Sequence, residues 1–197
     1  MSDNQPVRTA LFFGSFNPIH NGHLAIVRYV LDEGLNDEVW LVVSPRNPLK
    51  EGSALAPEGD RLEMARIAVK YAGLEGRLKV SDAEFSMPRP SYTIDTLERL
   101  RGEFPERDFS LLMGADILDE LERWKDWRKL LAEYRIMVYP RPGYVPQHHL
   151  DEVMLLEDAP VWDYSSTRVR NAIKDSRGGD MIPEAVMEYI KEHKLWS

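Results

Sequence analysis

The sequence predicts a single-domain α/β protein with an open parallel sheet flanked by helices on both faces. Strand-like and helix-like runs alternate along the chain, which is the pattern of a parallel sheet with crossover helices. The run EVWLVVS at 38–44 is almost continuously apolar, as expected for a strand that is buried on both faces. With 197 residues, of which 43% are hydrophobic, the chain is long enough to bury one substantial core.

Each element has its own local signal. The first strand, 8–13, leads into turn formers at 14–22 and then into a helix with apolar residues at helical spacing. Five further strands are expected, at 38–44, 78–80, 109–113, 135–139 and 153–156. Further helices are expected at 60–71, from an N-cap at Thr93 to Leu100, at 117–134 with a break near Trp124, at 167–174, and from Pro183 as the first helical residue. Two prolines make 84–92 a loop.

Composition excludes several classes of function. The net charge of −8 argues against a general nucleic-acid binder, which needs an excess of Lys and Arg. The absence of cysteine removes disulfides, thiolate catalysis and cysteine-based zinc sites. The first ten residues lack the apolar core of a signal peptide, and no apolar run reaches membrane-spanning length. We therefore expect a cytoplasmic protein with no membrane partner; the sequence is compatible with a homo-oligomer and leaves the oligomeric state open.

Residues 11–24, LFFGSFNPIHNGHL, form the first candidate site. They place His20 at the end of a turn and His23 in the first turn of the following helix. Unpaired backbone N–H groups and the helix dipole make such a junction suitable for an anion such as phosphate. Two imidazoles there could donate hydrogen bonds to phosphate oxygens or stabilise charge in a transition state. The alternative is that these histidines only cap the helix or lie in solvent.

Residues 164–170, YSSTRVR, form the second candidate site. Three hydroxyl side chains at a helix start, followed by Arg168 and Arg170, provide the donors and positive charge that a triphosphate needs. The alternative is a plain N-cap with surface arginines. Because the suggestive residues follow several strands of one parallel sheet, we expect them to converge at the carboxyl edge of that sheet.

GSFNPIHNGHL resembles the H-x-G-H signature of the nucleotidyltransferase superfamily, and YSSTRVR resembles the I-S-S-T-x-x-R motif of its adenylyl-transferring members, with Tyr164 in place of Ile. The resemblance implies a Rossmann-like fold for residues 1–197, with the helical part from about 165 packed on the same domain. It implies that His20 and His23 are catalytic and contact the ATP phosphates. The other ATP-binding residues that it implies in these two motifs are Gly14, Ser15, Phe16, Ser165, Ser166, Thr167 and Arg170.

Three middle segments, PSYTIDTLERL, MGADILDELERWKDW and YPRPG, resemble bacterial nicotinate-nucleotide adenylyltransferases. By that resemblance Gly114 and Asp116 border the adenosine, and Thr93, Trp124 and Arg141 belong to the acceptor site. Each has a plainer alternative: Trp124 with Trp127 can be core, and Thr93 and Asp116 can be helix caps.

The loop after the second strand departs from the family pattern. Many relatives read Pro-Pro-His-Lys there, whereas this chain reads SPRNPLK, with Leu49 in place of the histidine. Asn47 and Lys50 remain candidates for substrate binding.

The resemblance implies adenylyl transfer from ATP to nicotinate mononucleotide, giving deamido-NAD and pyrophosphate. Mg²⁺ is expected to enter with ATP and to bridge phosphate oxygens, without a dedicated cage of carboxylates. Two alternatives stay open: another acceptor, such as nicotinamide mononucleotide or phosphopantetheine, or a nucleotide-binding module without catalysis.

Overall fold

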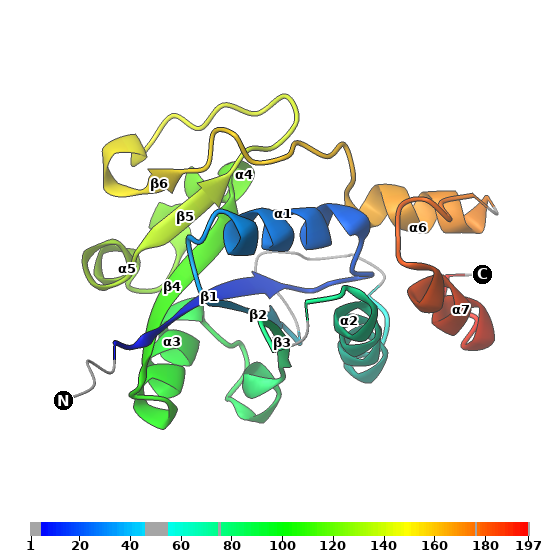
Figure 1. Cartoon of the computed structure of the whole chain (residues 1–197), viewed down its shortest axis with the longest axis horizontal. Coiled ribbons are helices and arrows are strands. Elements are labelled where there is room, and N and C mark those ends of the chain that lie inside the picture. The colour runs from blue at the N-terminus through cyan, green and yellow to red at the C-terminus, as the bar shows by residue number, and fades with distance from the viewer. Residues whose placement is uncertain (1–4, 46–54, 75, 176, 197) are drawn as a thin grey trace.

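Six parallel strands form the centre of the molecule in a computed structural model that describes residues 5–45, 55–74, 76–175 and 177–196. The strands are β1 (Val7–Gly14), β2 (Glu38–Val43), β3 (Leu78–Ser81), β4 (Arg107–Gly114), β5 (Ile136–Tyr139) and β6 (Met154–Leu155). They pair in the order β3-β2-β1-β4-β5-β6, as Figure 1 shows. Because the order reverses between β1 and β4, the expected ligand position is a crevice beyond the carboxyl ends of these two strands. The predicted fold class is confirmed.

Seven α-helices in the described part of the chain cover both faces of this sheet. They are α1 (Asn21–Asp32), α2 (Glu58–Tyr71), α3 (Thr93–Glu103), α4 (Ala115–Leu118), α5 (Trp127–Glu133), α6 (Ser166–Lys174) and α7 (Glu184–Glu192). Side chains of β1 alternate between the faces: Ala10 and Phe12 pack with α1, α2 and α7, whereas Leu11 packs with α3, α4 and α5. This period of two produces one apolar core on each side of the sheet.

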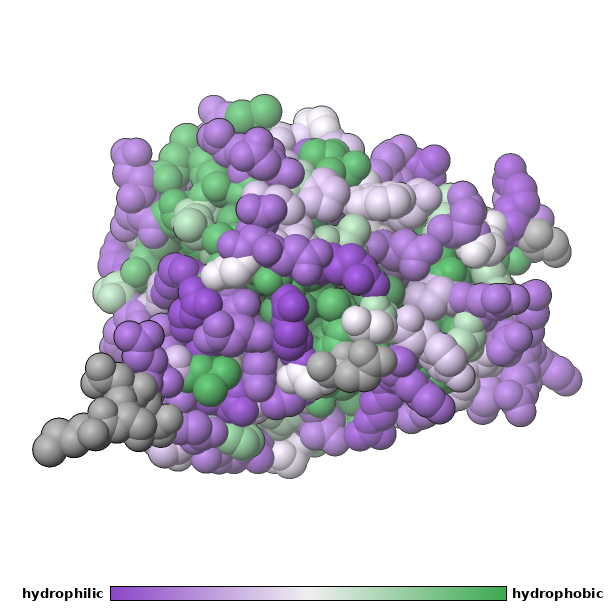
Figure 2. Space-filling view, in the orientation of Figure 1, coloured by the Kyte–Doolittle hydropathy of each residue, from purple (hydrophilic) through white to green (hydrophobic). Residues whose placement is uncertain are grey.

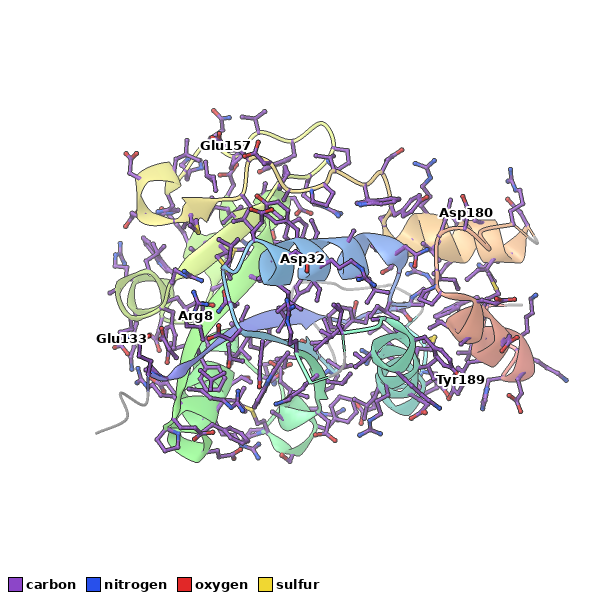
Figure 3. All side chains as sticks on the ribbon, viewed as in Figure 1. Arg8, Asp32, Glu133, Glu157, Asp180 and Tyr189 are labelled. Carbon is purple, nitrogen blue, oxygen red and sulfur yellow. The ribbon has the colours of Figure 1, made fainter. Side chains whose placement is uncertain are left out.

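The C-terminal helix α7 packs against α2. Val186 and Ile190 are buried, and the Tyr189 hydroxyl, labelled in Figure 3, donates to Asp60 Oδ1 at 2.8 Å. Figure 1 shows α7 beside α2, at the end of the molecule away from α3 and α5. The face drawn in Figure 2 is largely hydrophilic. No helix among the described residues is long and apolar enough to cross a membrane.

Three local expectations are corrected. Residues 84–92 are not all loop, because Ala83–Ser86 forms a 3-10 turn, η1. Thr93 is not an N-cap: it is the first residue of α3, and Tyr92 is the N-cap without a side-chain hydrogen bond. Pro183 is the N-cap of α7 rather than its first helical residue. The starts of α3 and α7 each differ from the expected position by one residue, which is within the usual uncertainty of helix boundaries. At 83–86 the tertiary structure overrides the local preference for a loop.

The expected helix at 117–134 is split into three short pieces. Helix α4 ends at Leu118, the 3-10 turn η2 spans Leu121–Arg123, and α5 begins at Trp127. The expected break near Trp124 is present, and Asp126 adopts a left-handed backbone with φ of 50°. As a result, Trp124 and Trp127 do not share one face of a continuous helix.

Candidate functional site

A cleft of about 820 Å³ lies beyond the carboxyl ends of β1 and β4. The site residues expected from the sequence line this cleft, except Asn47 and Lys50, which lie outside the described residues, and Arg168, which pairs with Asp163 away from the cleft. From the first motif these are Gly14, Ser15, Phe16, His20 and His23; from the second, Ser165, Ser166, Thr167 and Arg170; from the middle of the chain, Thr93, Gly114, Asp116, Trp124 and Arg141. The fold thus brings the residues of both motifs and of the middle segments together at the carboxyl edge of the sheet, as expected.

The turn after β1 is held closed by Phe16. This residue is buried and has a left-handed φ of 43°, and its ring packs edge-on against Phe12 with centroids 5.8 Å apart. A Cβ on Gly14 would lie 3.0 Å from Phe16 Cζ, so the ring can approach only because residue 14 has no side chain. Gly14 and Phe16 therefore determine the conformation of the turn together.

His20 and His23 cap α1 reciprocally. The His23 N–H donates to His20 Nδ1 at 3.4 Å, and the His20 N–H donates to His23 Nδ1 at 3.2 Å. The two rings stack with centroids 3.6 Å apart. Gly22 makes room for the stack, because a Cβ there would lie 3.0 Å from His20 Nδ1. The histidines are helix caps, as the plainer alternative holds, and they also line the cleft.

This capping fixes the protonation of both rings. Since each Nδ1 accepts a backbone hydrogen bond, the proton of each neutral ring must be on Nε2. Burial lowers the pKa of His20 to about 3, and the positive charge of Arg141 contributes to the shift. His20 is therefore neutral at physiological pH and can act as an Nε2–H donor but not as a general acid.

The second motif is bonded to the turn of the first. Ser165 caps α6 by accepting from the Arg168 N–H at 3.2 Å. The Ser166 hydroxyl donates to the Pro18 carbonyl at 3.1 Å, and Arg170 Nη1 donates to the Asn17 carbonyl at 2.8 Å. Segments about 150 residues apart in sequence thus form one wall of the cleft, with the hydroxyls and guanidinium of α6 beside the imidazoles of α1.

Asp116 and Arg141 form an ion pair in the cleft, with Arg141 Nε 3.4 Å from Asp116 Oδ1, and Arg141 also lines a small pocket with His20 and His23. Asp116 is not the N-cap of α4; that position is Gly114. A Cβ on Gly114 would lie only 2.5 Å from Asp116 Oδ1, so the glycine is what permits this position of the carboxylate. A carboxylate so placed can accept hydrogen bonds from ligand hydroxyls.

Trp124 is partly buried, packs on the core formed by α3, α4 and α5, and lines the cleft. Its indole N–H is buried without an acceptor among the described residues. The next residue, Lys125, pairs with Asp95 of α3 at 2.7 Å and lies 5.4 Å from the ring centroid of Tyr92. These contacts hold Trp124 opposite Thr93 at the start of α3.

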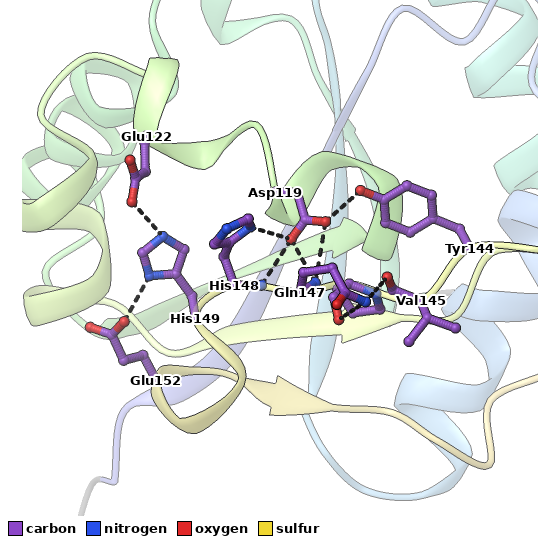
Figure 4. Close-up of polar contacts among 9 residues, drawn as sticks. Asp119, Glu122, Tyr144, Val145, Gln147, His148, His149 and Glu152 are labelled. Atoms are coloured by element: carbon purple, nitrogen blue, oxygen red, sulfur yellow. Dashed lines mark hydrogen bonds and ion pairs between the residues drawn. The ribbon is translucent and has the colours of Figure 1, made fainter.

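The loop after β5 is fastened to Asp119, as Figure 4 shows. The Tyr144 hydroxyl donates to Asp119 Oδ2 at 2.6 Å, and the backbone N–H groups of Gln147 and His148 donate to Oδ1 at 2.9 and 3.0 Å. The Tyr144 bond is the main reason that the pKa of Asp119 falls to about 2. The loop that begins at Arg141 is therefore anchored to the segment that follows α4.

Three site residues were not predicted from the sequence. Tyr139 ends β5 and lines the cleft, and burial raises its pKa to about 12. Glu84 is buried and accepts at 3.0 Å from the hydroxyls of both Ser91 and Thr96. Arg61 is buried behind the first turn. Its position on the apolar face of 60–71, four residues before the buried Ala65, was the available signal.

Comparison with known proteins identifies the family. A family model described as cytidylyltransferase-like matches residues 11–172, a span that contains both motifs. A probable nicotinate-nucleotide adenylyltransferase of Bacteroides thetaiotaomicron is 40% identical over 195 residues, covering 98% of this chain and 95% of the relative. One of Bacteroides fragilis is 45% identical over 170 residues, covering 84% and 82%.

Solved structures agree on the fold. Plasmodium falciparum nicotinic acid mononucleotide adenylyltransferase complexed with NaAD is similar with a TM-score of 0.80 at 17% identity, covering 96% of this chain and 97% of that chain. The same enzyme complexed with APC gives a TM-score of 0.77. With its matched motifs, its six-stranded fold and its relatives at 40% identity or more, the chain belongs to the cytidylyltransferase-like family, alongside probable nicotinate-nucleotide adenylyltransferases.

Proposed function

We propose that the protein transfers an adenylyl group from ATP to nicotinate mononucleotide, in the biosynthesis of NAD. A phosphate oxygen of the mononucleotide attacks the α-phosphorus of ATP in line, and the bond from that phosphorus to the bridging oxygen breaks. The bridging electron pair leaves with pyrophosphate, and the new phosphoanhydride is deamido-NAD. Because the attacking phosphate is already ionised, the reaction needs no strong general base, and catalysis consists of positioning and charge stabilisation.

The observation that carries this proposal is the joining of the two motifs into one wall by the Arg170–Asn17 and Ser166–Pro18 hydrogen bonds. A triphosphate along this wall meets the Nε2–H groups of His20 and His23 at its α-phosphate. Its β- and γ-phosphates meet the start of α6, where three side chains, Ser165, Ser166 and Thr167, surround the positive end of a nine-residue helix.

The opposite side of the cleft suits the remainder of the two substrates. Asp116, beside Gly114, accepts from a ribose hydroxyl, and Gly14, Ser15 and Phe16 of the first turn border the same nucleotide. The ring of Trp124 offers a flat apolar face for the pyridine, beside Thr93 and Arg141. The backbone N–H groups at the start of α3 add donors on that side. Asn47 and Lys50, outside the described residues, remain proposed contacts of the acceptor.

Mg²⁺ enters as part of the MgATP substrate. No group of three or more His, Asp or Glu side chains among the described residues is arranged to hold a metal ion. Phosphate oxygens are the natural ligands of this cation, which keeps several of its waters. Because the reaction consumes ATP, we place the enzyme in the cytoplasm.

The test is pyrophosphate release from MgATP with three acceptors measured side by side: nicotinate mononucleotide, nicotinamide mononucleotide and phosphopantetheine. The proposal requires the highest kcat/KM with the nicotinate nucleotide and formation of deamido-NAD. A higher kcat/KM with either other acceptor would replace the substrate assignment. Tight ATP binding without pyrophosphate release from any acceptor would favour a nucleotide-binding module.

A further inference from the structure

Arg61 is a buried cation behind the cleft. Only 1% of its surface is exposed, and its guanidinium donates to four backbone carbonyls. Nη1 reaches Ser15 O at 2.8 Å and Ser44 O at 2.6 Å, Nη2 reaches Pro45 O at 2.6 Å, and Nε reaches Ala56 O at 3.1 Å. The side chain therefore uses all three of its nitrogens on the main chain.

A packing role alone does not account for this charge. No carboxylate of the described residues forms an ion pair with Arg61; Glu58, near it on the same helix, pairs instead with Arg89 at 2.9 Å. Burial lowers the pKa of the Arg61 guanidinium, which reflects the cost of keeping a cation out of water. A buried charge is expensive unless its partners compensate for it, and an apolar side chain would join α2 to the sheet at less cost.

The four carbonyls belong to segments that meet at the cleft. Ser15 lies in the turn after β1, and Ser44 follows β2; both line the cleft, whereas Arg61 itself does not. Two further bonds tie the same segments together: the Ser44 N–H donates to Gly14 O at 2.9 Å, and the Ala56 N–H donates to Asn17 Oδ1 at 3.0 Å. Arg61 thus sets the distance between the turn and the end of β2 from behind.

We propose that Arg61 is a positioning residue for the nucleoside triphosphate: through the carbonyls of Ser15 and Ser44 it fixes the turn that leads to His20. It touches no substrate and acts through the main chain. The inference rests on the proposed function, since the triphosphate is the substrate assigned to this turn. We expect its larger effect on ATP, because Ser15 lies in the turn assigned to the triphosphate, whereas Arg61 reaches the proposed acceptor contacts Asn47 and Lys50 only through the chain that follows Pro45.

Lysine cannot replace this arginine. A guanidinium presents donors on three nitrogens in a rigid fork, whereas an ammonium is a single point on a flexible stem. Lysine at position 61 keeps the charge and most of the volume but cannot span carbonyls from three segments. The Arg61→Lys variant therefore separates the geometry of the clamp from its charge and from simple packing.

The experiment compares Arg61→Lys and Arg61→Ala with Arg66→Lys and Arg66→Ala, matched controls at an exposed arginine of the same helix. We expect Arg61→Lys to lower kcat/KM for ATP roughly tenfold or more, as misplacement of reacting groups does. The KM for the mononucleotide should stay within about threefold. Millimolar guanidinium should restore part of the activity of Arg61→Ala relative to KCl at equal ionic strength, and the Arg66 variants should behave as wild type.

A lower Tm with unchanged kinetic constants for ATP in Arg61→Lys would overturn the proposal, because it would make Arg61 merely structural. An equal loss for both substrates would also overturn it. If Arg61→Ala does not fold, Arg61→Lys alone decides. Should the wild type release no pyrophosphate, the proposed function fails separately, and the Kd for MgATP of Arg61→Lys against wild type, measured by calorimetry, still decides the role of Arg61.

Discussion

Replacing His20 by asparagine separates the two roles that the structure gives this residue. His20 accepts the His23 N–H as the cap of α1, and it presents Nε2–H to the cleft. Asparagine is among the best N-caps, so His20→Asn keeps an acceptor for the helix while it removes the Nε2–H donor. His20→Ala removes both, and the two variants together distinguish capping from catalysis.

The expected magnitudes differ for each role. Loss of one donor to a developing charge lowers kcat by about 10²–10³, so both variants should show this loss. Loss of the cap costs about 1 kcal/mol of unfolding free energy, and only His20→Ala should show that loss at pH 8. Pyrophosphate release measures kcat, and urea denaturation measures the free energy of unfolding.

The pH dependence of stability provides an independent check. The pKa of folded His20 is about 3, against 6.5 in the unfolded chain, so between these values the unfolded state binds more protons and stability falls as pH falls. At pH 5 this linkage amounts to about 2 kcal/mol relative to pH 8. His20→Asn removes the group, and its stability relative to wild type should rise by about that amount between pH 8 and pH 5. An unchanged difference at the two pH values, or kcat within about threefold of wild type, would refute the reasoning.

Two further predictions concern the other wall of the cleft. Lys125→Ala should raise the KM for the mononucleotide by no more than about fivefold, since the exposed Lys125–Asp95 ion pair beside Trp124 is screened by solvent and weak. Lys129→Ala, which breaks the neighbouring pair with Glu98 away from the cleft, should leave that KM unchanged in the same steady-state assay. Gly114→Ala should raise the KM for ATP roughly tenfold, because the added Cβ must displace the Asp116 carboxylate. Calorimetry with MgATP measures the corresponding Kd. A Kd equal to that of wild type would contradict this steric explanation.

Periodicity and turn residues were enough to predict the sheet and the place of the cleft. The strand at 38–44 is recognisable because both of its faces are buried, which leaves no polar alternation. The histidines are recognisable because a turn and a helix start must meet after a buried strand, and parallel strands bring their carboxyl ends to one edge. Such patterns predict strands, turns and helix starts because these elements depend on residues that are close together in the sequence.

The features that escaped prediction depend on contacts between distant segments. The place of Arg61 on the apolar face of its helix indicates burial, but no local pattern identifies the four carbonyls to which it donates. Thr93 has the ordinary features of an N-cap, but the buried carboxylate of Glu84 binds the hydroxyls of Ser91 and Thr96 on either side of it, and the helix begins at Thr93 itself. Partners of that kind are chosen by tertiary structure, so no local pattern identifies them.

The contacts around the first turn explain why so many side chains serve a segment of five residues. Stabilising charge by fixed donors is effective only if those donors do not have to reorganise as the charge develops. The turn at 14–18 accepts from Arg61 of α2 and from Ser166 and Arg170 of α6, and the imidazoles that follow it hold each other by reciprocal caps. Each of these bonds involves the backbone, and both imidazoles line the cleft. The second motif is therefore as much a brace for the first as a binding site in its own right. A substitution such as Arg170→Lys should consequently impair the use of His20 as well as the grip on phosphate.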